Sequence, residues 1–202
     1  MRWFLALFLM VAFSVAQADE VFLIPVKNPK AIYPKALLRA GMIGDVRASF
    51  LVKADGSVSN IRILKSDHPD FAAAAADALS HWQFKSWTIE TDKPAELEII
   101  IPMDFRFDAP DDINQWLKEL SCAEVNANLA SYPEYEGVDL APFHYVRGYL
   151  NNTFYQKQLS TEQRLDLISL LNQRATEIIG ACQKNPTHKY AGYLPEEIIR
   201  LL

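Results

Sequence analysis

The chain has 202 residues, of which 50% are hydrophobic, and a formal net charge of −5 at pH 7. Its 20 basic and 25 acidic residues are interspersed, which argues against a nucleic-acid partner. The length and the hydrophobic content suit one domain of ordinary size or two small ones.

Residues 1–18 are predicted to be a signal peptide. Arg2 supplies the positive start, the run from Trp3 to Val15 is apolar, and Ala16-Gln17-Ala18 matches an A-x-A cleavage site. The apolar run is shorter than the roughly 20 residues of a transmembrane helix. Cleavage before Asp19 would give a periplasmic protein with a net charge of −6 (−5 less the charge of Arg2). The alternative is an uncleaved membrane anchor.

The next segment, residues 19–32, contains Pro25 and Pro29 and is predicted to be an extended lead-in with a short added strand. Lys35 to Ala40 is predicted to form a short helix that Gly41 ends.

A β-hairpin and a helix are expected next. Apolar and polar residues alternate from Val46 to Lys53, which is typical of a half-buried strand. Asp55-Gly56 is a short turn signal, and a second strand is expected from Val58 to Lys65. Pro69 fits the first turn of a helix that would run to about Trp82.

After a polar loop at residues 88–94, alternation returns from Glu96 to Phe107. Leu97, Ile99, Ile101, Met103, Phe105 and Phe107 would share one face of this strand, and Glu98, Pro102, Asp104 and Arg106 the other. Since proline cannot donate a ladder hydrogen bond, Pro102 indicates an edge strand or a bulge.

Residues 28–107 contain an ordered set of motif residues: Tyr33, Pro34, Ala36, Gly41, Gly44, Val46, Phe50, Val52, Asp55, Gly56, Val58, Ser66, Phe71, Trp82, Phe84 and the stretch from Ile101 to Phe105. With this set, the region resembles the C-terminal domain of TonB-family proteins. One departure is Ser86, where the family usually has a proline two residues after the last aromatic of its W-x-F motif.

The resemblance implies a binding mode, since TonB-family domains pair an edge strand with a short segment of an outer-membrane transporter. The expected partner is therefore an envelope protein, and the expected surface is the strand from Glu96 to Phe107, beside Tyr33. Its outward residues would be Glu96, Glu98, Ile100, Pro102, Asp104 and Arg106. Two alternatives are a homodimer through the same edge and an edge covered by the C-terminal helices.

The rest of the chain, residues 109–202, is predicted to be helical. Asp108 or Asp111 would cap a helix running to about Leu129, and a second helix is expected from Phe143 to Gln156. Ser160 to Gln163 is a capping box, and Pro195 precedes a final short helix. The helix after Ser160 would bury the stripe Ile168, Leu171, Ala175, Ile178 and Cys182.

The predicted fold is thus α+β: a three-stranded antiparallel sheet with two helices at residues 19–108, followed by a helical extension. Cys122 and Cys182 both lie in this extension. In an oxidising compartment a lone pair of cysteines indicates one disulfide, here joining two helices.

No catalytic set is recognisable, so we expect neither an enzyme nor a cofactor or metal. The four histidines lie far apart in sequence, and Ser66-Asp67-His68 are adjacent and so unable to form a catalytic triad. Two alternative functions stay open. One is an energy transducer for outer-membrane transport with an uncleaved anchor, although the N-terminus lacks the family's anchor histidine and long proline-rich spacer. The other is an envelope glycan-binding protein or hydrolase that uses the helical half.

Overall fold

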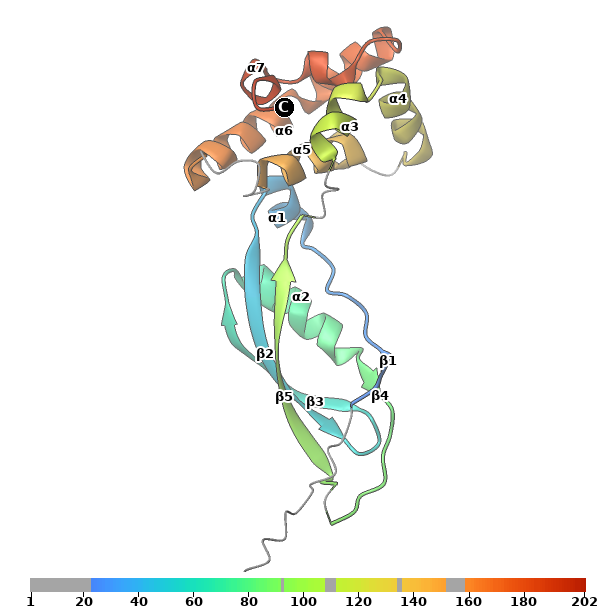
Figure 1. The fold of residues 1–202 in the computed structure, drawn as a ribbon, viewed down its shortest axis with the longest axis vertical. Helices are drawn as coiled ribbons and strands as arrows, with labels where there is room; N and C mark the ends of the chain where they lie inside the picture. Colours follow the sequence, from blue (N-terminus) through green and yellow to red (C-terminus); the bar gives the residue numbers. More distant parts are fainter. Residues whose placement is uncertain (1–22, 92, 108–111, 134–135, 152–158) are drawn as a thin grey trace, which may run out of the picture.

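The computed structural model describes residues 23–91, 93–107, 112–133, 136–151 and 159–202. The molecule is elongated, with a sheet-and-helix domain at one end and a helical unit at the other (Figure 1). The predicted α+β class is confirmed. The predicted signal peptide lies outside the described residues. Among those residues, no helix combines the length and the apolar character that a membrane span requires.

The elements of the sheet domain follow one another in the predicted order, except for a short strand at Gln83–Phe84, which was not predicted. They are β1 (Pro25–Lys27), α1 (Lys35–Ala40), β2 (Gly44–Lys53), β3 (Val58–Ser66), α2 (Pro69–Ser80), β4 (Gln83–Phe84) and β5 (Glu96–Phe105). The helical unit contains α3 (Ile113–Glu119), α4 (Cys122–Ser131), η1 (Gly137–Asp139), α5 (Ala141–Asn151), α6 (Thr161–Lys184), η2 (Tyr190–Tyr193) and α7 (Glu196–Ile199).

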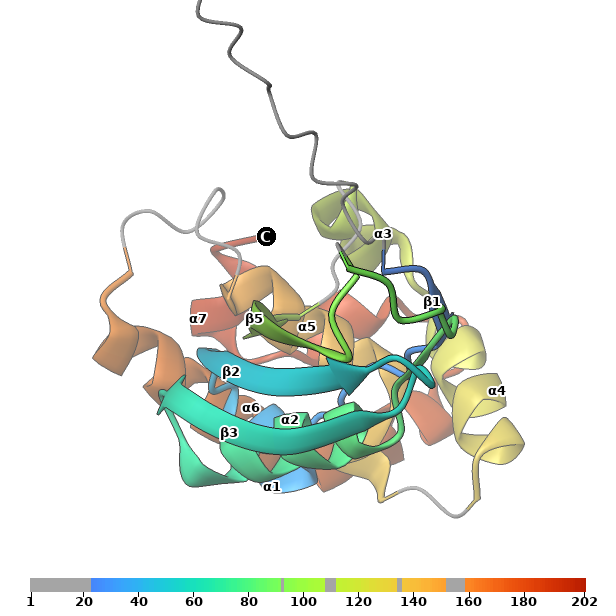
Figure 2. The same cartoon turned by 90° about the horizontal axis from the view of Figure 1, so that it is seen from below.

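The main sheet has the strand order β3-β2-β5 and is antiparallel throughout. Helix α2 covers one face of it (Figure 2). The alternation of β2 explains this arrangement, because Val46, Ala48, Phe50 and Val52 are buried while Arg47 is exposed. Phe71, Ala75 and Leu79 of α2 supply the facing apolar stripe.

Two glycines with a left-handed backbone conformation, in which φ is positive, allow the chain to reverse direction in this domain. Gly56 has φ of 85° in the turn from β2 to β3, and Gly41 has φ of 68° at the end of α1. Both positions agree with the sequence-based expectations, since a side chain disfavours this conformation.

The lead-in forms the expected short strand. β1 pairs antiparallel with β4, which follows α2, and Lys85 N–H donates to the Ile24 carbonyl. This second, two-stranded sheet ties the start of the described chain to the far end of α2 (Figure 1).

The single helix expected up to Leu129 is instead two helices, α3 and α4. Leu120 is extended (ψ 123°), and Ser121 and Glu124 form a capping box that starts α4. The backbone between the helices pairs with a distant loop, since Cys122 N–H donates to the His188 carbonyl and Tyr190 N–H donates to the Leu120 carbonyl. Asp112 is at the start of α3 without a side-chain cap, and Asp108 and Asp111 lie outside the described residues.

Helix α6 organises the core of the helical unit. Its five stripe residues, Ile168, Leu171, Ala175, Ile178 and Cys182, are all buried, and its capping box at Ser160 is present. The Cys122–Cys182 disulfide joins α4 to α6. Helix α5 is described as far as Asn151, so the remainder of the helix expected up to Gln156 lies outside the described residues.

We predict that Gly56→Ala destabilises the sheet domain. A Cβ there would lie 2.0 Å from the Phe84 carbonyl oxygen, and the positive φ alone costs about 1–3 kcal/mol. Thermal unfolding followed by circular dichroism measures the loss. The matched control is Gly180→Ala in α6, where an added Cβ would have no atom within 4 Å other than those of its own helix backbone. Alanine there should raise the free energy of unfolding by about 0.5–1 kcal/mol. Equal melting of Gly56→Ala and the wild type would contradict the turn assignment.

We predict that the double variant Cys122→Ala, Cys182→Ala loses about 2–5 kcal/mol of unfolding free energy, because its unfolded chain is no longer cross-linked. Denaturant titrations with and without a reductant provide the measurement. The reductant should lower the stability of the wild type toward that of the variant and leave the variant unchanged. A wild type insensitive to reductant would show that the disulfide does not stabilise the fold.

Candidate functional site

The candidate site is the outer edge of β5. Ten consecutive residue pairs, from Gly44↔Phe105 to Lys53↔Glu96, join β5 to β2 without a shift in register. Within the described residues β5 pairs with no other strand. The helical unit lies beyond the end of the sheet and not along this edge (Figure 1). The covering of the edge by C-terminal helices, one of the alternatives above, therefore does not occur among the described helices.

The backbone of β5 alternates between bonding to β2 and pointing away from it. Ala54 N–H donates to the Ala95 carbonyl at 2.8 Å, which continues the same register and makes this a hydrogen-bonded pair. Since hydrogen-bonded and non-bonded pairs alternate in an antiparallel ladder, the odd-numbered residues of β5 bond to β2. The even-numbered ones direct their N–H and C=O groups outward: Glu96, Glu98, Ile100, Pro102, Asp104 and Arg106.

Two further observations agree with this alternation. Lys53 N–H donates to the Ser57 carbonyl, and the Asp45 carbonyl accepts from Asp67 N–H. The backbone groups of odd-numbered β2 residues therefore point toward β3 and not toward β5. Pro102 falls on an outward position, where its missing N–H breaks no bond to β2. The proline is thus compatible with this strand because β5 is an edge.

The opposite edge of the sheet, β3, is less regular. Its pairing with β2 shifts register twice, between Arg47/Ala48 and between Ser49/Leu51. Asn60, in the second irregularity, has a φ of 50°. Bulges of this kind twist an edge and interrupt its row of hydrogen-bonding groups. Of the two edges, β5 is the one suited to pair with an incoming strand.

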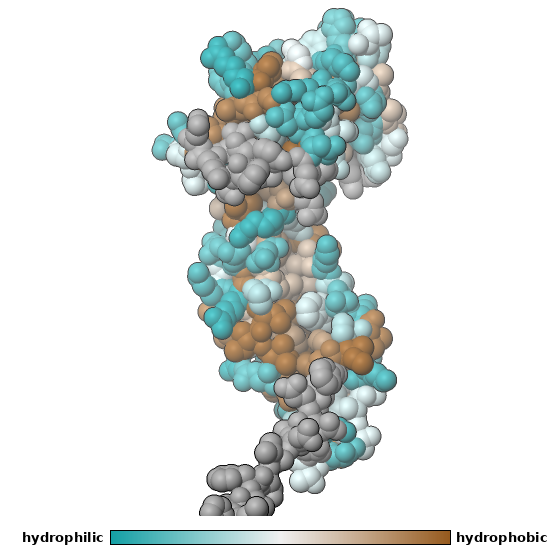
Figure 3. Space-filling model, viewed as in Figure 1, coloured by the Kyte–Doolittle hydropathy of each residue, from teal (hydrophilic) through white to brown (hydrophobic). Residues whose placement is uncertain are grey.

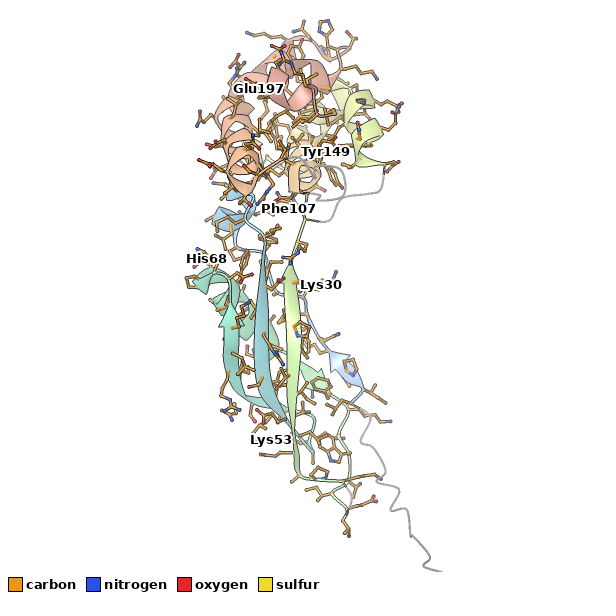
Figure 4. The ribbon with its side chains drawn as sticks, turned by 60° about the vertical axis from the view of Figure 1, so that its left-hand side comes forward. Lys30, Lys53, His68, Phe107, Tyr149 and Glu197 are labelled. Carbon is orange, nitrogen blue, oxygen red and sulfur yellow. A yellow bond between two sulfur atoms is a disulfide. The ribbon has the colours of Figure 1, made fainter. Side chains whose placement is uncertain are left out.

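A groove of about 680 Å³ runs beside the second half of β5, between that strand and the lead-in. Asn28, Pro29, Lys30 and Ala31 of the lead-in form one wall, and residues 101–106 form the other. Figure 4 shows Lys30 beside β5 and Phe107 where β5 meets the helical unit. The outward backbone groups of residues 102–106 therefore open beside a groove and not onto a flat surface.

Three further residues that line the groove come from elsewhere in the fold. Trp82, after α2, donates its indole N–H to the Pro29 carbonyl at 3.0 Å and so holds the lead-in in place. Leu38 comes from α1 and His144 from α5 of the helical unit. His144 also packs against Phe107, with ring centroids 5.4 Å apart. The extension thus contributes to the groove.

Tyr33 anchors the lead-in beside this groove. Its ring meets Phe71 and Phe105 edge-on, at 5.5 and 5.6 Å, and its hydroxyl donates to the Met42 carbonyl. Burial raises the pKa of Tyr33 to about 12, so the hydroxyl stays a donor at neutral pH. Pro34 follows as the residue before α1, which directs the chain from the groove into that helix.

The helical unit is attached to the sheet domain through α1. Arg39 donates from Nε and Nη2 to the two carboxylate oxygens of Asp139, both at 2.7 Å, and its guanidinium lies 3.0 Å from Glu136. Asn172 of α6 donates to the Arg39 carbonyl at 2.6 Å, and Arg164 to the Gly41 carbonyl at 3.0 Å. This attachment is independent of residues 108–111, which connect the two parts in sequence.

A buried arginine extends the same network into the helical unit. Arg147 of α5 donates to the Val138 carbonyl and to Asn172 Oδ1, at 3.1 and 3.0 Å. Burial lowers the pKa of Arg147 to about 10, so it keeps its charge at neutral pH. Asn172 is therefore held between Arg147 and Arg39.

The family-motif residues predicted from the sequence mainly position the site. Gly44 starts β2, where a Cβ would lie 2.7 Å from the Phe71 ring. Asp55 accepts from Ser57 in the hairpin turn, and Phe84 is buried against Phe50. The sequence-based reasoning missed the lead-in wall, Leu38 and His144. Two features of the sequence could have indicated the lead-in wall: Pro29, which favours an extended chain, and Trp82, the first aromatic of the W-x-F motif.

The described residues hold no group of three or more His, Cys, Asp or Glu side chains that could bind a metal ion. His68 and His81 flank the two ends of α2 and so do not meet. In the helical half, Phe143 and Tyr149 are buried in the core and Tyr145 packs on Trp116. The aromatic side chains at these positions therefore serve packing and do not form an open glycan-binding surface.

The fold and the open edge define a small α+β domain with one regular edge strand. The model of the family "Gram-negative bacterial TonB protein C-terminal" matches residues 29–107. Over 74 residues, 36% of this chain, the sequence is 36% identical to proteins described as "Protein TonB" from two strains of Xanthomonas campestris pv. campestris. Residues 29–107 are thus a TonB C-terminal domain.

These matches concern only part of each chain. The aligned region spans about a third, 33%, of the length of the Xanthomonas relatives. A solved structure titled "Solution NMR structure of Pseudomonas aeruginosa TonB CTD" is similar at 20% identity and a TM-score of 0.39. That comparison covers 45% of this chain and 91% of the other.

We predict that Asp139→Asn weakens the attachment of the helical unit. The Arg39 guanidinium lowers the pKa of the Asp139 carboxyl below its ordinary 3.8, so the ionised form stabilises the fold. The stabilisation by the ionised Asp139 carboxylate is fully present above about pH 3.8, the ordinary pKa of the group. It is lost as the pH falls through the lower pKa that Asp139 has in the folded state. The variant should lose about 2 kcal/mol at pH 7, and the difference from wild type should shrink in strong acid.

Urea denaturation at neutral pH and below pH 3 measures that difference. Asp166→Asn, which removes an exposed carboxylate from α6, is the matched control and should change stability little. A difference in unfolding free energy between Asp139→Asn and wild type that is the same at both pH values would contradict a stabilising role for the ionised Asp139 carboxylate.

Proposed function

We propose that this chain is a non-enzymatic periplasmic binding module. It would recognise an extended segment of an envelope protein, such as an outer-membrane transporter, by adding that segment to the sheet as a fourth strand. The observation that carries the proposal is the regular β5 edge, with outward backbone groups on residues 96, 98, 100, 102, 104 and 106. Extended peptides bind to such edges through main-chain hydrogen bonds.

The energetics favour a segment that pairs on both sides of Pro102. Five of the six outward residues keep an N–H donor, since only Pro102 lacks one. A net hydrogen bond contributes about 0.5–1.5 kcal/mol, so a few main-chain bonds need apolar contact to reach useful affinity. The groove offers that contact through Trp82, Ile101 and Met103.

The TonB C-terminal domain supports this proposal in general terms, because an interaction with envelope proteins is consistent with that family. The alternative of an energy transducer with an uncleaved N-terminal anchor concerns residues 1–18, which lie outside the described residues. That function stays an expectation from the family resemblance, and binding through β5 does not depend on it.

Photo-crosslinking in intact cells tests the proposal. A photoreactive residue replaces Ile100 or Asp104 on β5, and captured peptides are identified by mass spectrometry. Two controls are Leu64 on the β3 edge and Gln173 on α6, both exposed. We expect the β5 positions, and not the controls, to capture one short segment of an envelope protein.

Three other outcomes are informative. Capture of a second copy of this chain through β5 would identify a homodimer in place of a partner complex. Equal capture from Leu64 and Ile100 would show that the two edges are equivalent. Capture from Gln173 alone would place the binding surface on the helical unit and overturn the proposal.

A further inference from the structure

The side chains on the outer face of the sheet carry a charge pattern that bears on the partner. The strands farther from the binding edge are basic there, with Arg62 and Lys65 on β3 and Arg47 and Lys53 on β2. The edge strand presents three carboxylates on the same face, Glu96, Glu98 and Asp104, and the cation Arg106 follows at its end. Leu64 of β3 and Ile100 of β5 are exposed apolar residues of the same strands. Hydrophobic and hydrophilic areas are accordingly mixed on the surface of the sheet domain (Figure 3).

Within the sheet, two of these edge carboxylates face a cation. Glu98 accepts from Arg62 at 2.5 Å, across β2, and Glu96 is directly opposite Lys53 in the register. Opposite charges across neighbouring strands stabilise a sheet. On the outer face, the basic side chains of β2 and β3 thus stabilise the acidic ones of β5. A fourth strand with basic side chains would continue this change of sign from strand to strand.

Asp104 is in a different position, because the residue opposite it on β2 is Asp45. Like charges in directly opposite positions are destabilising. Arg106 compensates for Asp45, with its guanidinium 2.5 Å from that carboxylate. Among the described residues, Asp104 has no ion-pair partner, so its exposed carboxylate is left for a cation that comes from outside the chain.

Strand geometry connects these carboxylates to the partner. On an added strand, the side chains opposite the even-numbered residues of β5 project on the same outer face. The intervening side chains project on the inner face, toward the groove with Trp82, Ile101 and Met103. Lys30 also lines the groove, so a basic side chain is disfavoured on that inner face.

We propose that the segment bound at β5 alternates basic with apolar side chains, the basic ones meeting Glu96, Glu98 and Asp104 and the apolar ones entering the groove. The inference rests on the proposed function, because it specifies the chemistry of the same strand-addition site. The partner is thus a short, extended, amphipathic and positively charged segment of an envelope protein.

Two synthetic peptides provide the test with the full chain. Both are capped nine-residue peptides that alternate valine with a charged residue, lysine in one and glutamate in the other. Titration calorimetry gives the affinities, and amide resonances of Glu98, Ile100 and Asp104 report binding at the edge. We expect the lysine peptide to bind about tenfold more tightly, since several exposed ion pairs, each weak by itself, would add to its affinity.

Charge reversal on β5 tests whether the carboxylates of this strand cause the preference for the lysine peptide. The double variant Glu96→Lys, Asp104→Lys should reverse the preference toward the glutamate peptide. The control Glu162→Lys, Glu177→Lys makes the same change of charge on exposed positions of α6 and should keep the wild-type preference. If the β5 double variant does not fold, Asp104→Asn should reduce the preference while relieving the repulsion from Asp45.

The outcomes separate this inference from the proposed function. If both peptides shift the β5 amides with equal affinity, and charge reversal changes nothing, strand addition stands and the charge preference is wrong. If neither peptide shifts those amides, both are overturned. A preference for lysine that persists in the β5 double variant would mean that the overall negative charge of the chain, and not the edge, attracts the peptide.

Discussion

The unbroken pairing of β2 with β5 is the constraint on which the site depends. Ten residue pairs without a bulge keep every second backbone group of β5 pointing away from the sheet. One inserted residue would reverse this alternation beyond it, and would move apolar side chains from the α2 face to the outer face. The burial of Phe50 and Phe105 against α2 therefore also determines which backbone groups a partner meets.

The helical unit adds to the site without covering it. The Arg39–Asp139 pair and Asn172 attach the unit to α1, at the end of the sheet. From there α5 places His144 at the Phe107 end of the groove. A strand added along β5 would thus approach the helical unit at this end, while the other end of β5 points away from the helical unit (Figure 1).

Features that depend on neighbouring residues could be predicted from the sequence. Gly41, the Asp55-Gly56 turn and the Ser160 capping box each act within one turn, and Pro102 indicates an edge because its effect is local. The groove was not predictable, because Trp82 and Pro29 meet only in the folded chain. The break between α3 and α4 has a local signal in Ser121 and Glu124, but its pairing with His188 is non-local.

Hydrogen–deuterium exchange of individual β5 amides in the unliganded protein tests the central claim most directly. The amides of Ile99, Ile101 and Met103 bond to β2 and should exchange slowly, whereas those of Glu98, Ile100 and Asp104 should exchange quickly. Fast and slow exchange should therefore alternate along the strand. Equal protection of the two sets would show that the outward edge is already paired, and would contradict strand addition at β5.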